Sequence, residues 1–282
     1  MNEQVILITG TSSGFGLLMA ASLCKQHKVY ATMRDVTKAK ALKEAAGVHS
    51  GRLHVLPLDV TDTKSIIDVI ETIKENEGHL NCVINNAGYG IGGFFEDLTE
   101  TEIRDQFETN FFGLQKVTRE ALPLIRESRG LRKVINISSI AGHTGTPCLS
   151  AYNASKWAVE GFSEALYFEL QAFGVDVVLV EPGAFKTKIF TDNVKLAQFM
   201  KHKQSPYYQY SQHLLTYLKK VQETLTTDPE VVSNLVVSIV NMTKPKFRYL
   251  VGRDAKLRLF LKRLLPFSWY SKIVLKKFYK SV

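Results

Sequence analysis

Residues 5–16, VILITGTSSGFG, decide the fold of this 282-residue chain. The apolar run at 5–8 predicts a buried strand, and a helical pattern begins at Gly14. Between them the glycines have the spacing GxxxGxG, which lets the backbone approach a phosphate at the N-terminus of a helix. This stretch predicts a phosphate-binding turn, with a purely structural strand-to-helix turn as the alternative. The residues expected at the phosphate are Gly10, Ser12, Ser13, Gly14, Phe15 and Gly16.

Outward from this turn, short apolar runs alternate with longer helical patterns. We expect strands over residues 5–9, 29–33, 53–57, 82–85, 133–138, 175–180 and, more briefly, 249–251. We expect helices over 14–26, 62–75, 101–126, 152–173 and 229–242, with Thr99 and Glu102 as a capping box before the third. Strands this rich in Val, Ile and Leu are typical of a parallel sheet covered on both faces. The fold class is therefore α/β, with a doubly wound parallel sheet.

The chain has no internal repeats and no low-complexity linkers, so one domain over residues 1–252 is the simplest organisation. Residues 186–225 are polar and aromatic, and we expect them to form a lid over the carboxyl edge of the sheet, without a strand. Residues 253–282 form a basic amphipathic tail.

Composition excludes several classes of protein. Hydrophobic residues make up 45% and charged residues 22% of the chain, which is typical of a soluble globular protein. We expect neither a secretory signal nor a transmembrane helix, because no suitable apolar run is present. Cys24, Cys82 and Cys148 lack metal-ligand spacing and fit a reducing, cytoplasmic compartment. The seven histidines are scattered, so no metal site is expected.

The net charge of +9 arises almost entirely from the tail. Residues 256–282 contain eight Lys or Arg and no acid, whereas the rest of the chain is almost neutral. Apolar residues repeat at helical spacing on both sides of Pro266, as in Leu257, Leu261 and Leu264. Two interpretations stay open: the apolar stripe packs on the core or on a second subunit, or it lies on an anionic membrane. No recognition motif accompanies the charge, so no nucleic-acid partner is expected.

The end of the second strand indicates which dinucleotide the turn accepts. NAD-binding proteins usually place an acid there for the ribose 2′-hydroxyl, but here Met33 takes that position and Arg34 follows. A guanidinium suits a 2′-phosphate, and Ser12 could add a hydroxyl. These residues favour NADP(H). The alternative is that Asp35 takes the ribose, which would favour NAD(H).

Tyr152 and Lys156 lie four residues apart and share one helix face. A nearby ammonium stabilises a phenolate, so we expect the pKa of Tyr152 to fall toward neutrality, where a general acid/base works well. A surface pair is the alternative. Polar residues at the carboxyl ends of other strands, where open α/β sheets bind ligands, argue against that alternative. They include Ser138, Ser139, Asn86 and Thr187.

Together these motifs resemble the short-chain dehydrogenase/reductase family over residues 4–190. The residues that carry the resemblance are those at 9–16, 59–60, 85–88, Asn110, Ser139, Tyr152, Lys156 and 182–183. Residues 11–14 and 31–35 resemble the hydroxysteroid and retinol dehydrogenase branch most. The resemblance implies a Rossmann-type fold, a homodimer or homotetramer, and an NADP(H)-dependent oxidoreductase that interconverts an alcohol and its ketone or aldehyde.

The resemblance also implies roles for individual residues. Tyr152 would exchange the proton with the substrate oxygen, and Ser139 would hydrogen-bond that oxygen. Lys156 would lower the pKa of Tyr152 and hold the nicotinamide ribose, and Asn110 would position a water beside Lys156. Ser138 competes with Ser139, but the thirteen-residue spacing to Tyr152 favours Ser139. Further cofactor contacts are implied for Asp59, Val60, Asn86, Ala87, Gly88, Pro182, Gly183 and Thr187.

The substrate site is expected to include Ser139, Tyr152, Cys148, Leu149 and Phe185. Aromatic residues follow the fourth strand and recur in the lid, and they predict a deep apolar pocket for a bulky lipophilic molecule such as a steroid, a retinoid or a long-chain carbonyl compound. They are Phe94, Phe95, Phe185, Phe190, Phe199, Tyr207, Tyr208 and Tyr210. The alternative is that they only pack the lid onto the domain. The alternative to an enzyme is a non-catalytic cofactor-binding regulator or a membrane-associated adaptor.

Overall fold

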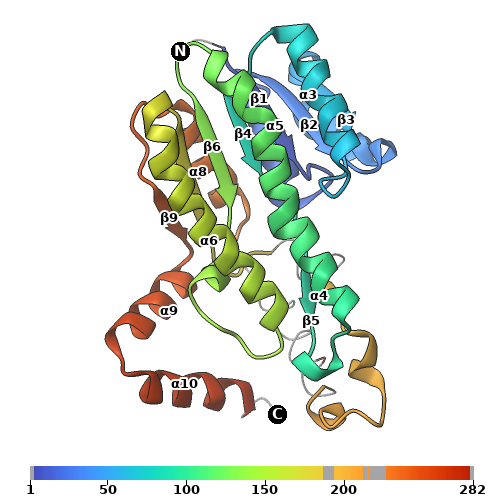
Figure 1. Ribbon diagram of the computed structural model, residues 1–282, viewed down its shortest axis with the longest axis vertical. Coiled ribbons are helices and arrows are strands. Elements are labelled where there is room, and N and C mark those ends of the chain that lie inside the picture. The colour runs from blue at the N-terminus through green and yellow to red at the C-terminus, as the bar shows by residue number, and fades with distance from the viewer. Residues whose placement is uncertain (1–2, 187–193, 212–214, 216–226, 280–282) are drawn as a thin grey trace.

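A seven-stranded parallel sheet forms the centre of the computed structural model, which describes residues 3–186, 194–211, 215 and 227–279 (Figure 1). The strand order is β3-β2-β1-β4-β6-β7-β9, and every neighbouring pair is parallel. The strands are β1 (Val5–Thr9), β2 (Lys28–Met33), β3 (Leu53–Pro57), β4 (Cys82–Asn85), β6 (Lys133–Ile137), β7 (Asp176–Pro182) and β9 (Arg248–Val251).

Helices cover both faces of this sheet. Alternate residues of β1 point to opposite faces, so Ile6 and Ile8 belong to one core and Val5 and Leu7 to the other. The first core packs against α1 (Gly14–Leu23), α2 (Lys40–Ala46) and α8 (Glu230–Asn241), and the second against α3 (Thr63–Glu77), α5 (Gly113–Glu127) and α6 (Ser150–Leu170). The predicted doubly wound α/β fold is confirmed.

The strand order places a ligand crevice beside β1. From β1 the chain builds outward through β2 and β3, then returns to add β4 on the other side of β1. Ligands of open α/β sheets bind at such a reversal, outside the carboxyl ends of the strands. In Figure 1 the strands point toward the end of the molecule where β5 (Gly90–Gly92) and α10 (Phe267–Tyr279) lie.

The long helix predicted over residues 101–126 is not continuous. It comprises α4 (Glu100–Phe107), a π-helical turn over Glu108–Phe112, and α5. The Thr99–Glu102 capping box at its start has both of its hydrogen bonds. A π turn inserts one residue into the helical repeat, and the sequence periodicity on either side does not reveal it.

The prediction that residues 186–225 lack a strand was wrong. Residues Val194–Leu196 form β8, which pairs with β5 in a separate parallel sheet of two strands. A strand of three residues is too short for its side-chain alternation to stand out in the sequence.

The tail forms two helices, α9 (Arg253–Leu264) and α10, which separate at Pro266. Ala255 and Tyr270 are buried, and the Phe278 ring meets the Phe94 ring edge-on at 6.3 Å between centroids. The tail therefore packs on the domain at several points. Among the described helices, none combines the length and the apolar character needed to cross a bilayer.

Candidate active site

The glycine-rich turn fits closely against the segment that follows β4. Gly10 has a φ of 73°, and a Cβ on it would lie 2.8 Å from the Cα of Ala87. A Cβ on Gly16 would lie 2.2 Å from the carbonyl oxygen of Gly10. Thr9 Oγ1 accepts hydrogen bonds from the backbone N–H groups of Asn86 and Ala87, each at 3.0 Å. Only glycine fits at Gly10 and Gly16 without moving the backbone.

The turn has the form of an anion cradle. The side-chain amide of Asn86 donates to the carbonyl oxygens of Thr9 and Gly10, both at 2.9 Å, and so fixes the turn. No side chain caps α1 at Ser13, and no acid occurs in its first turn. The first N–H groups of α1 can therefore receive an anion. The residues of the turn fit a pyrophosphate, and Ser12 is exposed beside them.

Arg34 and Asp35 follow β2 directly, and their side chains have different surroundings. Met33 is buried at the strand end, and Arg34 follows it on the surface. The carboxylate of Asp35 accepts from the N–H of Thr37 at 3.1 Å and from its hydroxyl at 2.6 Å, which caps the next helical turn. These bonds hold the pKa of Asp35 below its ordinary value. Asp35 already has partners within its own loop, whereas Arg34 extends into solvent.

Asp59 and Val60 lie in the loop after β3. One oxygen of Asp59 accepts from the N–H and the hydroxyl of Thr61 at 2.9 and 2.8 Å, which shapes the loop. Val60 is buried, and a Cβ on Gly113 would lie 2.7 Å from its side chain, so the loop packs directly on α5. Their contact with an adenine ring stays a prediction.

Lys156 joins α6 to the carboxyl end of β6. Its Nζ donates to the carbonyl oxygen of Ile137 at 2.9 Å, and the side chain is buried. Burial lowers the pKa of Lys156 to about 8, and the nearby Glu160 carboxylate acts in the opposite direction. The ammonium therefore lies in a setting where it can exchange a proton near neutral pH.

The expected fall in the pKa of Tyr152 does not occur. Loss of solvent around its hydroxyl raises that pKa, and a hydrogen bond with Ser139 only partly offsets the rise. The Lys156 ammonium, which binds the Ile137 carbonyl, is not among the groups that shift this pKa. Attraction between the ammonium and the phenolate consequently does not set the pKa in this structure.

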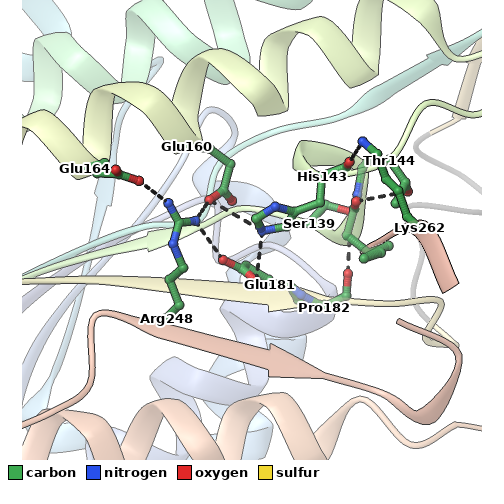
Figure 2. Close-up of polar contacts among 11 residues, drawn as sticks. Ser139, His143, Thr144, Glu160, Glu164, Glu181, Pro182, Arg248 and Lys262 are labelled. Atoms are coloured by element: carbon green, nitrogen blue, oxygen red, sulfur yellow. Dashed lines mark hydrogen bonds and ion pairs between the residues drawn. The ribbon is translucent and has the colours of Figure 1, made fainter. Parts of the chain in front are cut away.

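Ser139, rather than Ser138, is the serine that meets Tyr152. Its hydroxyl oxygen accepts from the N–H of Ala141 at 3.1 Å, and the hydroxyl donates to the carbonyl oxygen of Pro182 at 3.5 Å (Figure 2). Ser138 is buried on the side of Glu160 instead, and it acts to lower the pKa of that carboxyl. The structure thus distinguishes the two serines that the sequence left in competition.

Asn110 lies in the π-helical turn and anchors the segment after β4. Its side-chain oxygen accepts from the N–H of Tyr89 at 3.0 Å, and its amide donates to the Tyr89 carbonyl at 2.9 Å. A Cβ on Gly88 would lie 3.1 Å from the same oxygen, and Gly90 packs on the Tyr152 ring. The structure therefore brings Asn110 and Tyr152 to the same crevice. The role of Asn110 in positioning a water stays a prediction.

A small apolar cluster borders the predicted catalytic residues. Cys148 is the one non-glycine residue with a positive φ in the described chain, at 63°, and its carbonyl accepts from the N–H of Gly93 at 2.9 Å. Its side chain is buried, which raises the pKa of the thiol to about 12. Leu149 is half-buried beside it. The buried members of the cluster are Ile91, Phe94, Leu98, Cys148, Ala151, Ala197 and Met200.

Phe185 does not line this cluster, contrary to prediction. It is fully buried in the main core, where its ring meets Phe15 edge-on at 5.7 Å. An aromatic residue just after a strand can point into the core as readily as into a crevice, and the sequence alone does not distinguish the two. Phe185 therefore packs on Phe15 of the phosphate turn and not on the apolar cluster beside Tyr152.

The segment after β7 is held by β9 and by the tail helix α9. The N–H of Gly183 donates to the Val251 carbonyl at 2.8 Å, and the N–H of Ala184 donates to Asp254 on α9 at 3.0 Å. Pro182 is buried at the strand end. The predicted contacts of Thr187 and Phe190 lie outside the described residues.

Sequence reasoning missed two buried amides that shape the crevice. Gln106 accepts from the N–H of Ile91 and donates to the carbonyl of Tyr89, both at 2.8 Å. Asn153 donates to the carbonyls of Ala141 and Thr144 at 2.9 and 2.7 Å and so ties α6 to the loop after Ser139. Gln106 lies four residues before Asn110, and that spacing was the available signal.

Comparisons with known proteins agree with this geometry. The family model for short chain dehydrogenases matches residues 4–197. A 3-ketodihydrosphingosine reductase of Bacteroides thetaiotaomicron is 39% identical over 255 residues, which cover 89% of each chain. Human Retinol dehydrogenase 8 is 33% identical over 253 residues, covering 87% of this chain and 80% of the relative.

A solved structure extends the match to the whole chain. A short-chain dehydrogenase from Streptomyces avermitilis superposes with a TM-score of 0.80 at 32% identity, covering 98% of this chain and 97% of that one. The chain belongs to the short-chain dehydrogenase/reductase family, near its retinol and hydroxysteroid dehydrogenase branch. It is an oxidoreductase of that family, whose fold binds nicotinamide cofactors.

Proposed function

We propose that this oxidoreductase uses NADP(H) to interconvert a bulky lipophilic alcohol and its ketone or aldehyde. The observation that carries the proposal is the meeting of three side chains at one strand end. Ser139 hydrogen-bonds Tyr152 at the carboxyl end of β6, and Lys156 binds the carbonyl of the last residue of that strand. The phosphate turn follows β1, two strands away in the same sheet.

The protein's own part of the reaction is the proton. In reduction, the Tyr152 hydroxyl donates its proton to the substrate oxygen, and Ser139 donates a hydrogen bond that stabilises charge on that oxygen. In oxidation the same groups act in reverse. When bound, the nicotinamide supplies or accepts the hydride at the substrate carbon. Lys156 would hold the nicotinamide ribose, and Asn110 would position a water that connects Lys156 to solvent.

The preference for NADP(H) rests on the loop after β2. Arg34 is free to extend toward a 2′-phosphate, and exposed Ser12 lies in the neighbouring turn. The competing acid, Asp35, caps its own helical turn through Thr37. Arginine binds phosphate through a charge-assisted fork, and this interaction would add to the cradle at α1.

The preference for a lipophilic substrate rests on the apolar cluster beside Tyr152. Phe94 stacks on Tyr207 at 4.3 Å and meets Phe278 of the tail edge-on. This packing agrees with the alternative in which lid aromatics hold the lid in place, yet it also gives the crevice an apolar wall. The two relatives above are named for a long-chain ketone and for retinol, and both names fit such a wall.

We also infer that the exposed side of the tail contacts an anionic membrane surface. Phe267 is 79% and Trp269 62% exposed, although each would favour an apolar or interfacial setting. Other exposed apolar residues of the tail are Leu257, Phe260, Leu264, Ile273 and Leu275, and the exposed cations among them are Lys256, Arg263, Lys272 and Lys276. Flotation with phosphatidylserine vesicles tests this inference. Binding is expected, and absence of binding would favour packing on a second subunit.

A homodimer or homotetramer would use a surface groove that α4, the segment before it and the π-helical turn after it form together. The groove is lined by apolar residues that include Phe95, Ile103 and Phe112, and Phe112 is 43% exposed. Sedimentation of the wild-type protein and of Phe112→Glu tests this assembly. A monomeric wild-type protein would contradict it.

The reaction itself is tested by following the absorbance of reduced nicotinamide. Purified protein would receive NADPH or NADH with a panel of lipophilic ketones and aldehydes, and a small polar sugar serves as the control carbonyl compound. We expect oxidation of NADPH with a lipophilic compound. Cofactor binding without any turnover would support the non-catalytic regulator or adaptor instead.

A further inference from the structure

Four ionisable side chains lie close together near Ser139 and Lys156, and they have no part in the proton transfer proposed above. They are His143, Glu160, Glu181 and Arg248, called here the His143 cluster (Figure 2). His143 follows the turn that begins at Ser139, Glu160 lies on α6, Glu181 on β7 and Arg248 on β9. Four separate parts of the fold therefore converge on one group of charges.

The two acids of the cluster are buried and have close partners. The side chains of Glu160 and Glu181 are only 7% and 2% exposed. One Arg248 nitrogen pairs with Glu160 and lies 3.1 Å from Glu181, and His143 Nε2 lies 3.1 Å from the other Glu181 oxygen. Buried carboxylates without partners are costly, so the guanidinium and the imidazole are needed to keep both acids ionised.

The pKa values of the two acids follow from these contacts. Burial and the neighbouring Glu181 raise the pKa of Glu160, although Arg248 and His143 oppose that rise. Burial also acts to raise the pKa of Glu181, but His143 and Arg248 outweigh it and hold that pKa below its ordinary value. The cluster thus distributes negative charge unequally, and Arg248 and His143 determine how much of it stays on Glu160.

A metal ion is a poor alternative occupant. The ligand atoms of His143, Glu160 and Glu181 lie within 4.8 Å of one another, which is compatible with a cation. The Arg248 guanidinium, however, already contacts both carboxylates. A second cation at this point would meet direct repulsion.

Each acid of the cluster adjoins a catalytic element. Glu160 lies one helical turn after Lys156 on α6, and its charge acts on the pKa of Lys156. A Cβ on Gly142 would lie 2.7 Å from Glu160 Cγ and 3.2 Å from the Lys156 carbonyl, so the loop after Ser139 packs tightly on this turn. Glu181 directly precedes Pro182, whose carbonyl accepts from Ser139.

The loop after Ser139 is held from both ends. The Ser139 side chain caps a 3-10 turn over Ile140–Gly142, and His143 closes it with a bond from its N–H to the Ile140 carbonyl at 3.0 Å. On the outer side, Lys262 of α9 donates to the His143 carbonyl. The tail helix therefore helps to hold the backbone of His143, and with it the Ser139 turn, in place beside the other residues of the cluster.

We propose that the His143 cluster is a positioning device that holds the Ser139 turn against α6 and keeps a negative charge one helical turn from Lys156. Its residues do not touch the reacting atoms. They act through Lys156 and Ser139, so their role in catalysis rests on the proposed function. The groups that face Lys156 and the cluster are the Ile137 carbonyl of β6, Glu181 of β7, Arg248 of β9, His143 of the loop and Lys262 of α9.

The test is the ionisation of Lys156 in the intact protein, followed by NMR of ¹³Cε-labelled lysine and assigned with Lys156→Met. Glu160→Gln keeps the shape of the side chain but removes its charge. We expect the Lys156 midpoint to fall below its value of about 8 by roughly one to two pH units, as Coulomb's law gives for one charge a helical turn away. Glu164→Gln is the matched control, because Glu164 also binds Arg248 but is 55% exposed and lies one turn farther away.

A second pair of variants keeps the proposal testable if Glu160→Gln does not fold. Glu160→Met, which removes the charge without leaving an unpaired amide, should lower the Lys156 midpoint in the same direction, and Glu160→Asp, which keeps the charge, should restore it. An unchanged midpoint in folded Glu160→Gln or in folded Glu160→Met would overturn the proposal. The titration needs no turnover, so a failure of the proposed reaction would appear separately, as a wild-type protein that reduces no carbonyl compound.

Discussion

Lys156 on α6 donates a 2.9 Å hydrogen bond to the carbonyl oxygen of Ile137, the last residue of β6. This bond joins the first half of α6 to the carboxyl end of the sheet, where the Lys156 ammonium is buried. The cost of burying that charge is visible in the pKa of Lys156, which falls to about 8 from an ordinary value of 10.5.

Stability should therefore depend on pH through Lys156. Between about pH 8 and about pH 10.5 the unfolded chain binds more protons at this position than the folded chain, so the free energy of unfolding rises with pH there. Lys156→Met removes this contribution, and its free energy of unfolding should rise less steeply, by up to about 1.4 kcal/mol per pH unit. Urea unfolding across this range measures both slopes, and equal slopes would show that Lys156 is not perturbed.

Cofactor choice should change with Arg34. Arg34→Met should raise the KM for NADPH about 10- to 100-fold, the loss typical of a charge-assisted hydrogen bond, and leave the KM for NADH nearly unchanged. Asp35→Asn is the neighbouring control and should preserve the preference for NADPH, because Asp35 serves its own loop. If Asp35→Asn changes the KM for NADH more than Arg34→Met changes the KM for NADPH, Asp35 is the residue that binds the ribose.

The phosphate turn should not tolerate a methyl group at Gly16. A Cβ there would lie 2.2 Å from the Gly10 carbonyl oxygen, so Gly16→Ala forces the turn out of shape and should abolish cofactor binding, measured by calorimetry. Gly51→Ala is the matched control, because a Cβ on Gly51 has no neighbour within 4 Å. Full-affinity binding by Gly16→Ala would mean that the cofactor does not use this turn.

The two adjacent serines should differ in their effect on kcat. Ser139→Ala removes the hydroxyl that bonds Tyr152 and should lower kcat about 100- to 1,000-fold, which is typical of the loss of one donor to a developing oxyanion. Ser138→Ala alters a buried contact with Glu160 and should cost much less. Comparable losses in both variants, with thermal stability unchanged, would contradict the assignment of Ser139.

Much of the fold could be predicted because each strand is a separate apolar run. β1, β3 and β4 have the predicted bounds, and β2 differs by one residue. The turn at Gly10 and the Tyr152–Lys156 spacing are local patterns, so the sequence also located the crevice. The π-helical turn around Asn110 could not be predicted, since it interrupts a helix without changing its composition.

The remaining site features depend on contacts between distant residues. His143 and Arg248 are 105 positions apart, and their neighbours in sequence give no sign that they share one cluster. The direction of the pKa shift at Tyr152 depends on burial and on which group Lys156 binds, and a spacing of four residues determines neither. Phe185 illustrates the same limit, because its side chain turned inward to meet Phe15.

The central claim is that Tyr152 supplies the proton in a hydride transfer involving NADP(H), and label transfer tests it most directly. Wild-type protein and Tyr152→Phe would be incubated with 4-deuterated NADPH and the preferred lipophilic carbonyl compound, and the alcohol would be analysed by mass spectrometry. We predict one deuterium on the carbinol carbon with wild-type protein, at least a 100-fold slower transfer with Tyr152→Phe, and equal binding of NADPH by both. Equal rates of transfer, or no transfer by wild-type protein that binds NADPH, would contradict the account.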